Sequence, residues 1–238
     1  MDLGRDIMRL LVFSDIHGNS QALYALLRMM SELEYDTVAF LGDIFGYYYE
    51  QEECLRLLKE IPDLIWLKGN HDKYAIDAYC DNADSELLVK LYGHSYSNLK
   101  SRFMTDEISF LESKPYACTL KVDGKQVGMF HGRPGDPVEG RIYEDTELPE
   151  TEFSPYDYVL IGHTHCKIDK KIGNTRIISP GSLGQPRDCR GYGFALLDVE
   201  SDNCEFINVE VDNGELKKQI DINDKDLAKL YDVISREM

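Results

Sequence analysis

The sequence lacks any apolar run long enough to span a bilayer, and it also lacks the uninterrupted core of a signal peptide. The only apolar stretch near its start is broken by Asp2, Arg5, Asp6 and Arg9. The six cysteines are scattered, with no C-x-x-C pair and no tight disulfide framework. These absences lead us to expect free thiols, a cytoplasmic location and no membrane partner.

Basic residues are also scarce. Against 43 Asp and Glu there are 26 Lys and Arg, which gives a formal net charge of −17. A nucleic acid would be repelled on approach, so we expect no nucleic-acid partner and a small substrate instead. No long block of like charge occurs, which favours a solvated acidic surface over an interaction tail.

The first seventy residues alternate strand-like and helix-like patterns. Strands are expected at Leu10–Ser14, Thr37–Leu41 and Leu64–Leu67, with one helix capped by Asn19 or Ser20 and running to about Leu33, and a second at Glu52–Glu60. This order is typical of a parallel α/β protein, which binds ligands beyond the carboxyl ends of its strands. The length favours a single domain over residues 1–238, and we hypothesise that residues 1–7 are an extension upstream of it.

The rest of the chain predicts further elements. Helical runs occur at Ser85–Tyr92 and Thr105–Glu112 within the segment 73–113, whose boundaries the sequence defines least well. Strands are expected at Tyr116–Val122, Gln126–Phe130, Tyr158–Ile161, Lys167–Ile172, Thr175–Ser179, Gly191–Asp198 and Cys204–Val211, with a long loop at Arg133–Pro155 and a closing helix from Asp224 to about Arg236. We expect the closing helix to pack on the outside of the core.

Five of the six histidines lie in clusters with Asp, Asn and Gly, each placed where a strand gives way to a loop. The clusters are Asp15-Ile16-His17, Gly42-Asp43, Gly69-Asn70-His71-Asp72, His131-Gly132 and Gly162-His163-Thr164-His165. Carboxylate, amide and imidazole ligands together suit divalent Mn, Fe, Co, Ni or Zn. The glycines permit sharp turns or close backbone approach at these ends.

Two ions about 3.5 to 4 Å apart would clamp both oxygens of an in-line displacement. We assign Asp15, His17, Asp43 and His165 to one ion, and Asp43, Asn70, His131 and His163 to the other, with Asp43 as the bridge. A water shared by the two ions would lose its proton near neutral pH and attack. His71 is the candidate acid for the departing oxygen, because the pKa of imidazole lies near the working pH, and Asp72 is a candidate to orient it.

These motifs resemble those of the calcineurin-like metallophosphoesterases. The family pattern of D-x-H, G-D, G-N-H-D or E, H, and G-H-x-H is complete between Asp15 and His165. The segment Ser179–Arg187 is similar to one in small bacterial and archaeal members. The resemblance implies a four-layer fold, with a central β-sandwich flanked by helices, and a site holding two divalent ions, of which Mn is favoured. Relatives often pair, so it also implies a homodimer as one state.

One departure from the family is informative. Family protein phosphatases and diadenosine tetraphosphate hydrolases carry Asp-Arg-Gly shortly after Gly-Asp, which supplies a partner for the acid histidine and an arginine for phosphate. The sequence after Asp43 has neither, so protein phosphatase activity is not indicated and His71 has no assigned partner.

Other residues have competing interpretations. Arg187 and Arg190 could bind substrate phosphate, although a surface or structural ion pair is about as good an explanation. Residues 179–182 could instead brace the metal ligands. The tyrosines at 47–49 could line an aryl or base pocket, but packing under a loop is the stronger expectation. His94 lies outside every cluster and is expected to be structural or exposed.

The main hypothesis is a metal-dependent hydrolase of small phosphomonoesters or phosphodiesters. The second is a binding scaffold of the same fold, like the retromer subunit that resembles this family but has lost ligand residues. Retention of all seven ligands and of His71 argues against the scaffold. A nuclease ranks third because of the acidic charge.

Overall fold

The computed structural model describes residues 8–188 and 190–234, which contain two five-stranded mixed sheets. The first has the order β10-β9-β1-β2-β3, and the second the order β4-β5-β6-β8-β7. Their strands are β1 Arg9–Phe13, β2 Thr37–Phe40, β3 Ile65–Trp66, β4 Ala117–Val122, β5 Lys125–Phe130, β6 Tyr158–Ile161, β7 Lys167–Ile172, β8 Thr175–Pro180, β9 Gly193–Asp198 and β10 Asn203–Asn208. The expected extension, residues 1–7, lies outside the described residues.

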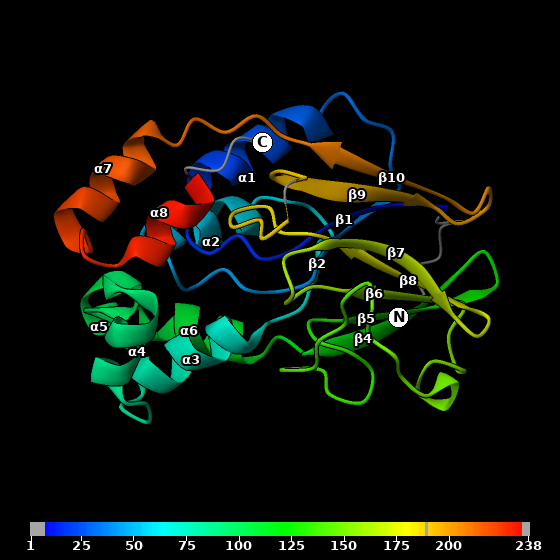
Figure 1. Cartoon of the computed structure of the whole chain (residues 1–238), viewed down its shortest axis with the longest axis horizontal. Coiled ribbons are helices and arrows are strands. Elements are labelled where there is room, and N and C mark those ends of the chain that lie inside the picture. The colour runs from blue at the N-terminus through cyan, green and yellow to red at the C-terminus, as the bar shows by residue number, and fades with distance from the viewer. Residues whose placement is uncertain (1–7, 189, 235–238) are drawn as a thin grey trace.

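The helices form the outer parts of the molecule (Figure 1). They are α1 Ser20–Met30, α2 Gln51–Lys59, α3 Asn70–Tyr79, α4 Ser85–Tyr92, α5 Leu99–Arg102, α6 Thr105–Glu112, α7 Gly214–Asn223 and α8 Ala228–Ile234, with short 3-10 turns η1 His94–Tyr96 and η2 Glu150–Glu152. In Figure 1 the strands fill the right of the view, and α3 to α8 lie at the left. Among the described residues no helix is long and apolar enough to cross a membrane.

Alternating side chains build the sandwich, because successive residues of a strand point to opposite faces. In β1, Leu10 and Val12 face the second sheet and pack in one cluster with residues such as Met129 and Leu160. Leu11 and Phe13 face the other way and pack with the helices. The outer face of the second sheet is covered by the segment between β5 and β6, including Ile142 and Phe153. The sandwich flanked by helices that the resemblance implied is confirmed.

An open parallel sheet would not account for this topology. The strands β1, β2 and β3 are parallel, as are β5, β6 and β8, but each sheet also has antiparallel edge strands. Antiparallel hairpins join β4 to β5 through Asp123-Gly124 and β7 to β8 through Gly173-Asn174. The parallel strands of both sheets end toward the same region, where the histidine clusters lie.

The closing helix was predicted in part: α8 forms at Ala228–Ile234, inside the expected range, but it does not begin at Asp224. The chain folds into two helices, and Asp224 lies between them rather than starting one. The carboxylate of Asp224 accepts hydrogen bonds from the backbone N–H of His94 (2.9 Å) and the Tyr49 hydroxyl (2.6 Å). These tertiary contacts interrupt the helix at a position that local pattern could not identify. The expected end near Arg236 falls outside the described residues.

Asn70 and His71 also differ from expectation, because they form the first turn of α3 rather than a loop. Asp72 explains this helix start: its carboxylate accepts the N–H of Gly69 at 2.9 Å, as an acidic residue in a capping box does. The first helix is capped by Asn19, whose side chain accepts the N–H of Ala22 at 3.2 Å.

Candidate metal centre

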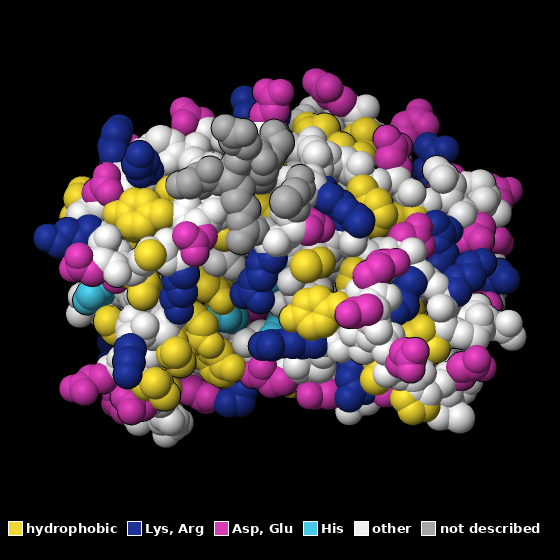
Figure 2. Space-filling view, viewed as in Figure 1, with side chains coloured by type: hydrophobic (Ala, Val, Ile, Leu, Met, Phe, Trp, Pro, Cys, Tyr) yellow, Lys and Arg dark blue, Asp and Glu magenta, His cyan; other side chains and the backbone are white. Residues whose placement is uncertain are grey.

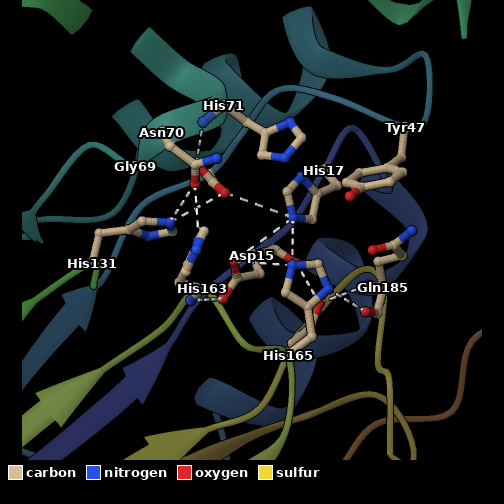
Figure 3. A network of polar contacts seen from close by, with 12 residues as sticks. Asp15, His17, Tyr47, Gly69, Asn70, His71, His131, His163, His165 and Gln185 are labelled. Carbon is tan, nitrogen blue, oxygen red and sulfur yellow. Dashed lines mark hydrogen bonds and ion pairs between the residues drawn. The ribbon is translucent and has the colours of Figure 1, made fainter. Parts of the chain in front are cut away.

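Seven side chains expected from the sequence lie together beyond the carboxyl ends of strands from both sheets (Figure 3). They are Asp15, His17, Asp43, Asn70, His131, His163 and His165. All are buried, with at most 5% of any of these residues exposed. The fold therefore gathers residues from five separate positions in the chain into one nearly closed site.

One group surrounds the first expected ion position. The Nε2 atoms of His17 and His165 lie 3.0 Å apart. Asp15 Oδ1 lies 3.3 Å from the Nε2 of His165 and 3.7 Å from that of His17. Asp43 Oδ2 is 3.8 Å from His17 Nε2. These four donor atoms converge as ligands of one ion would.

The second group shares Asp43 with the first. Asp43 Oδ2 lies 3.3 Å from His131 Nε2. Asn70 Oδ1 is 3.0 Å from His131 Nε2 and 3.0 Å from His163 Nδ1. One carboxylate oxygen thus contacts both groups, which is the position that a bridging ligand requires.

Backbone carbonyls orient three of the histidines. In each case the ring Nδ1 lies against a carbonyl oxygen, so Nδ1 carries a proton and Nε2 is the ring nitrogen that faces the site. The acceptors are Phe45 for His17 (2.6 Å), Leu41 for His131 (2.8 Å) and Gln185 for His165 (2.6 Å). These contacts with backbone carbonyls fix the orientation of the three imidazole rings so that each Nε2 points toward the expected metal position.

Two carboxylate oxygens test whether the site fits a cation. Asp15 Oδ1 and Asp43 Oδ2 are buried and have no hydrogen-bond partner among the described residues. A buried, unpaired charge is costly, so such atoms call for a compensating positive group. Burial alone would raise the pKa of both acids. The neighbouring histidines outweigh this effect, so that His165 holds the pKa of Asp15, and His131 holds the pKa of Asp43, well below the usual range. The residues present therefore fit divalent ions.

The histidine pKa values agree with this fit. Burial lowers the pKa of His163 and His165 to about 4, which leaves both rings neutral at pH 7. Burial would also lower the pKa of His131, but the carboxylate of Asp43 outweighs it and raises the pKa to about 10. The proton on His131 balances the charge of Asp43 where a metal ion would otherwise do so.

The backbone is strained around the site. Five of the seven side chains belong to residues in the left-handed region: Asp15 (φ 57°), His17 (51°), Asp43 (69°), His163 (65°) and His165 (61°). Non-glycine residues seldom adopt this conformation, and it persists where the surrounding structure imposes it. Gly69 is required for a different reason, because a Cβ there would lie 2.0 Å from Asp43 Oδ1.

His71 lies beside the shared carboxylate. Its backbone N–H donates to Asp43 Oδ1 at 2.9 Å, and its Nδ1 is 2.6 Å from the hydroxyl of Tyr96. Gly46 makes room for this pair, since a Cβ there would lie 2.3 Å from His71 Nδ1. Burial lowers the pKa of His71 well below its usual range. Tyr96 is therefore the partner that the sequence left unassigned.

Asp72 does not orient His71, and that expectation was wrong. Its carboxylate accepts the backbone N–H groups of Asp43 (2.9 Å), Ile44 (2.8 Å) and Gly69 (2.9 Å). Adjacent side chains at the start of a helix point in different directions, so Asp72 fixes the loop that carries Asp43 instead.

The segment after β8 braces the site, as one interpretation of its sequence expected. Ser182 Oγ donates to the carbonyl of Asp15 at 2.6 Å, and Gln185 supplies the carbonyl that orients His165. Arg187 follows this segment, and its guanidinium donates to the hydroxyl of Tyr47 at 2.9 Å. Arg190 instead donates to the carbonyl of Lys167 and has a structural role.

Comparison with known proteins decides the family. Residues 8–202 match the model of the calcineurin-like phosphoesterase superfamily domain. The chain belongs to this superfamily. A metallophosphoesterase of Sphaerobacter thermophilus superimposes with a TM-score of 0.71 at 26% identity, covering 90% of this chain and 93% of that one. A hypothetical protein of Pyrococcus horikoshii gives a TM-score of 0.76 at 22% identity, covering 95% and 97%.

A sequence relative of this phosphoesterase-superfamily protein is an uncharacterized protein of Methanocaldococcus jannaschii. The two are 27% identical over 222 residues, which cover 84% of this chain and 87% of the relative.

Two site residues of this superfamily member were missed from the sequence. Tyr96 lies in the segment 73–113, where no motif marked it. Arg141 lies in the long loop after β5, and its Nε donates to His163 Nε2 at 3.0 Å. Both come from segments without a repeating pattern, so only the tertiary structure brings them to the site.

Proposed function

We propose that the protein is a metal-dependent phosphoesterase that hydrolyses small phosphomonoesters or phosphodiesters at two divalent ions, with Mn favoured. The observation that carries the proposal is the pair of buried, unpartnered carboxylate oxygens on Asp15 and Asp43, which face imidazole nitrogens in two groups that share Asp43. Membership of a phosphoesterase superfamily supports the same reaction.

In this proposal Asp15, His17, Asp43 and His165 hold one ion, and Asp43, Asn70, His131 and His163 hold the other. When bound, the ions lower the pKa of the attacking water toward neutrality and stabilise charge on the phosphoryl oxygens.

The remaining roles fall to side chains. His71 donates a proton to the departing oxygen once the negative charge of the bound phosphoryl group has raised the pKa that burial lowers in the free protein, and Tyr96 fixes the orientation of its ring. Arg187 binds a phosphate oxygen once its guanidinium leaves the Tyr47 hydroxyl.

The scaffold and nuclease alternatives have less support. A scaffold has no need for buried carboxylates without partners or for left-handed residues at five ligand positions, both of which cost stability. The net charge of −17 disfavours a nucleic-acid substrate.

The test is hydrolysis by purified, metal-analysed protein. With Mn added, p-nitrophenyl phosphate, bis-p-nitrophenyl phosphate or both should be cleaved, and a chelator should stop the reaction. Protein that binds two Mn ions yet cleaves neither ester would contradict the proposal. Protein that binds no Mn but holds another macromolecule tightly would favour the scaffold.

A further inference from the structure

Access to the centre is narrow and lies beside His71 and His163. Each of these two residues is 5% exposed, Asn70 is 3% exposed, and the remaining expected ligands are at most 1% exposed. Figure 2 shows histidine surface near the middle of this face, between basic and hydrophobic side chains. A substrate must therefore contact the side chains around His71 and His163 to reach the metals.

Besides Tyr96, three tyrosine rings lie around His71. Their centroids lie 5.1 Å (Tyr47), 5.4 Å (Tyr74) and 4.6 Å (Tyr92) from its ring. Tyr74 and Tyr92 are only partly buried and nearly parallel, with centroids 6.1 Å apart and an angle of 22° between the planes. Together they present aromatic surface on the side of the site where the proposed acid lies.

Not all nearby tyrosines have this character. Tyr48 is fully buried, and Tyr49 donates its hydroxyl to Asp224 at 2.6 Å, so both serve to attach the C-terminal helices. The hydroxyl of Tyr92 makes no hydrogen bond to a described residue. Packing thus explains the positions of Tyr48 and Tyr49. It does not explain why Tyr74 and Tyr92 keep part of their aromatic surface exposed.

Three cations flank these rings. Arg141 contacts His163, Arg187 contacts Tyr47, and the ammonium of Lys229 lies 5.3 Å from the centroid of Tyr92. Within the part of the chain that the structure describes, none of the three has a carboxylate within 4.0 Å, whereas Arg9, Arg56, Arg102, Arg133 and Arg176 all do. In a chain of net charge −17, these three cations, none with a carboxylate within 4.0 Å among the described residues, attract an anion to the opening.

The contacts of His163 also make Arg141 available. Here its Nε donates to His163 Nε2, which places the ring proton on Nδ1. If Nδ1 binds a metal, the proton must lie on Nε2, and Arg141 can no longer donate to it. Glu139 Oε2, 3.9 Å from that nitrogen, is the group that can then accept. Arg141 would then lose its contact with His163 and its guanidinium would be free to bind an anion.

We propose that this opening is a subsite for an aromatic group, so that the preferred substrates are small phosphate esters carrying an aryl ring or a nucleobase. Tyr74 and Tyr92 contact the ring, and Arg141 and Arg187 bind phosphoryl oxygens from opposite sides of the centre. A ring inserted between two others needs about 7 Å between their centroids, and those of Tyr74 and Tyr92 are 6.1 Å apart. The substrate ring therefore lies against the exposed surface of these tyrosines and not between them. The inference rests on the proposed function and narrows it to a substrate class.

The physical basis is stacking combined with charge. Contact between a base and an aromatic side chain strengthens binding by about 5- to 150-fold and tolerates different bases, because every ring has a π-face. A planar guanidinium binds phosphate oxygens in pairs. A long polynucleotide would still be repelled by the rest of the acidic surface.

Two phosphonates provide the test, because their C–P bond is not hydrolysed. Benzylphosphonate and cyclohexylmethylphosphonate have similar size and the same head group, and differ in whether the ring is aromatic. Calorimetry on Mn-loaded protein should give benzylphosphonate a dissociation constant at least about 10-fold lower, although its ring is the less hydrophobic of the two.

Variants then assign the effect to residues. Tyr92→Leu should remove most of the preference, and Tyr92→Phe should retain it. Tyr24→Leu, the same change at an exposed tyrosine of α1, is the matched control and should leave it unchanged. Arg141→Gln should weaken both phosphonates about equally.

Equal dissociation constants in the parent protein would overturn the subsite. So would a preference that survives the double variant of Tyr74→Leu and Tyr92→Leu. Hydrolysis of p-nitrophenyl phosphate is measured in the same preparations, so turnover with equal constants leaves the proposed function standing. Absence of both turnover and phosphonate binding in Mn-loaded protein counts against both proposals.

Discussion

Replacing Tyr96 with phenylalanine removes one hydroxyl and leaves the ring that packs in the core. That hydroxyl is 2.6 Å from His71 Nδ1, and both residues are buried. When His71 is protonated, its Nδ1–H must donate to this oxygen, because in the proposed mechanism the other ring N–H faces the leaving group. The variant therefore leaves a buried imidazolium with one unpaired donor just when the acid is needed.

The expected loss follows from that contact. A hydrogen bond to a charged group contributes about 1.5 to 3 kcal/mol. Since about 1.4 kcal/mol corresponds to a factor of ten, kcat should fall by about 10- to 150-fold. KM should change little, because the Tyr96 hydroxyl contacts His71 and has no proposed contact with substrate.

The assay compares leaving groups of different basicity in the presence of Mn. Phenyl phosphate needs a proton on its departing oxygen more than p-nitrophenyl phosphate does, so Tyr96→Phe should reduce kcat much more for phenyl phosphate. Tyr79→Phe is the control, since among the described residues its hydroxyl contacts only Thr105 Oγ1, at 3.1 Å. Equal losses for both substrates, or no loss with phenyl phosphate, would refute the role of Tyr96.

Three further predictions concern the metals, pH and thiols. Asp43→Asn should reduce bound Mn from two ions per chain. It should also lower kcat by more than about 100-fold, because replacing a residue that only supports a metal ligand already costs up to about 100-fold. Unchanged metal content by elemental analysis would contradict the role of Asp43 as the bridging ligand. In chelator-treated protein, burial lowers the pKa of His163 and His165 to about 4, so the folded state binds fewer protons than the unfolded state between pH 6.5 and 4. The free energy of unfolding should therefore fall on acidification from pH 7 to 5, as urea denaturation would measure, and a rise would show that other groups dominate. Iodoacetamide at pH 8 should modify exposed Cys80 before Cys118, because burial raises the pKa of the Cys118 thiol to about 11. Peptide mass spectrometry would measure the order of modification, and earlier modification of Cys118 would contradict this prediction.

Most strands and several helices could be predicted from local pattern. The helices α4 and α6 have the bounds that the apolar spacing predicted, and the two hairpins follow their Asp-Gly and Gly-Asn turns. The helix α7 was missed, because only Leu216 and Ile220 of its ten residues are buried. Its stability depends on packing against Tyr47 and Tyr48, which no local signal contains.

Residues of the candidate site that belong to a sequence motif could be predicted, and those outside any motif could not. The expected ligands follow strands at short, constant spacing, so the sequence alone placed them at one edge. Tyr92, Tyr96 and Arg141 occur in segments whose path depends on helix packing and on a long loop. Asp72 belongs to the same motif as His71, yet its side chain binds backbone N–H groups instead of His71. The direction in which a helical side chain points relative to the site depends on how the helix packs in the fold.

By itself the sequence determined the chemistry of the centre: which donors are present, their order along the chain, and hence the superfamily. That information is local, because each cluster needs only a strand end and a turn. Only the tertiary structure decided which oxygen lies between the two groups, which residue holds the proposed acid His71, and which rings and cations surround the opening. Those contacts join residues far apart in the chain, and their distances depend on how the two sheets and their helices pack.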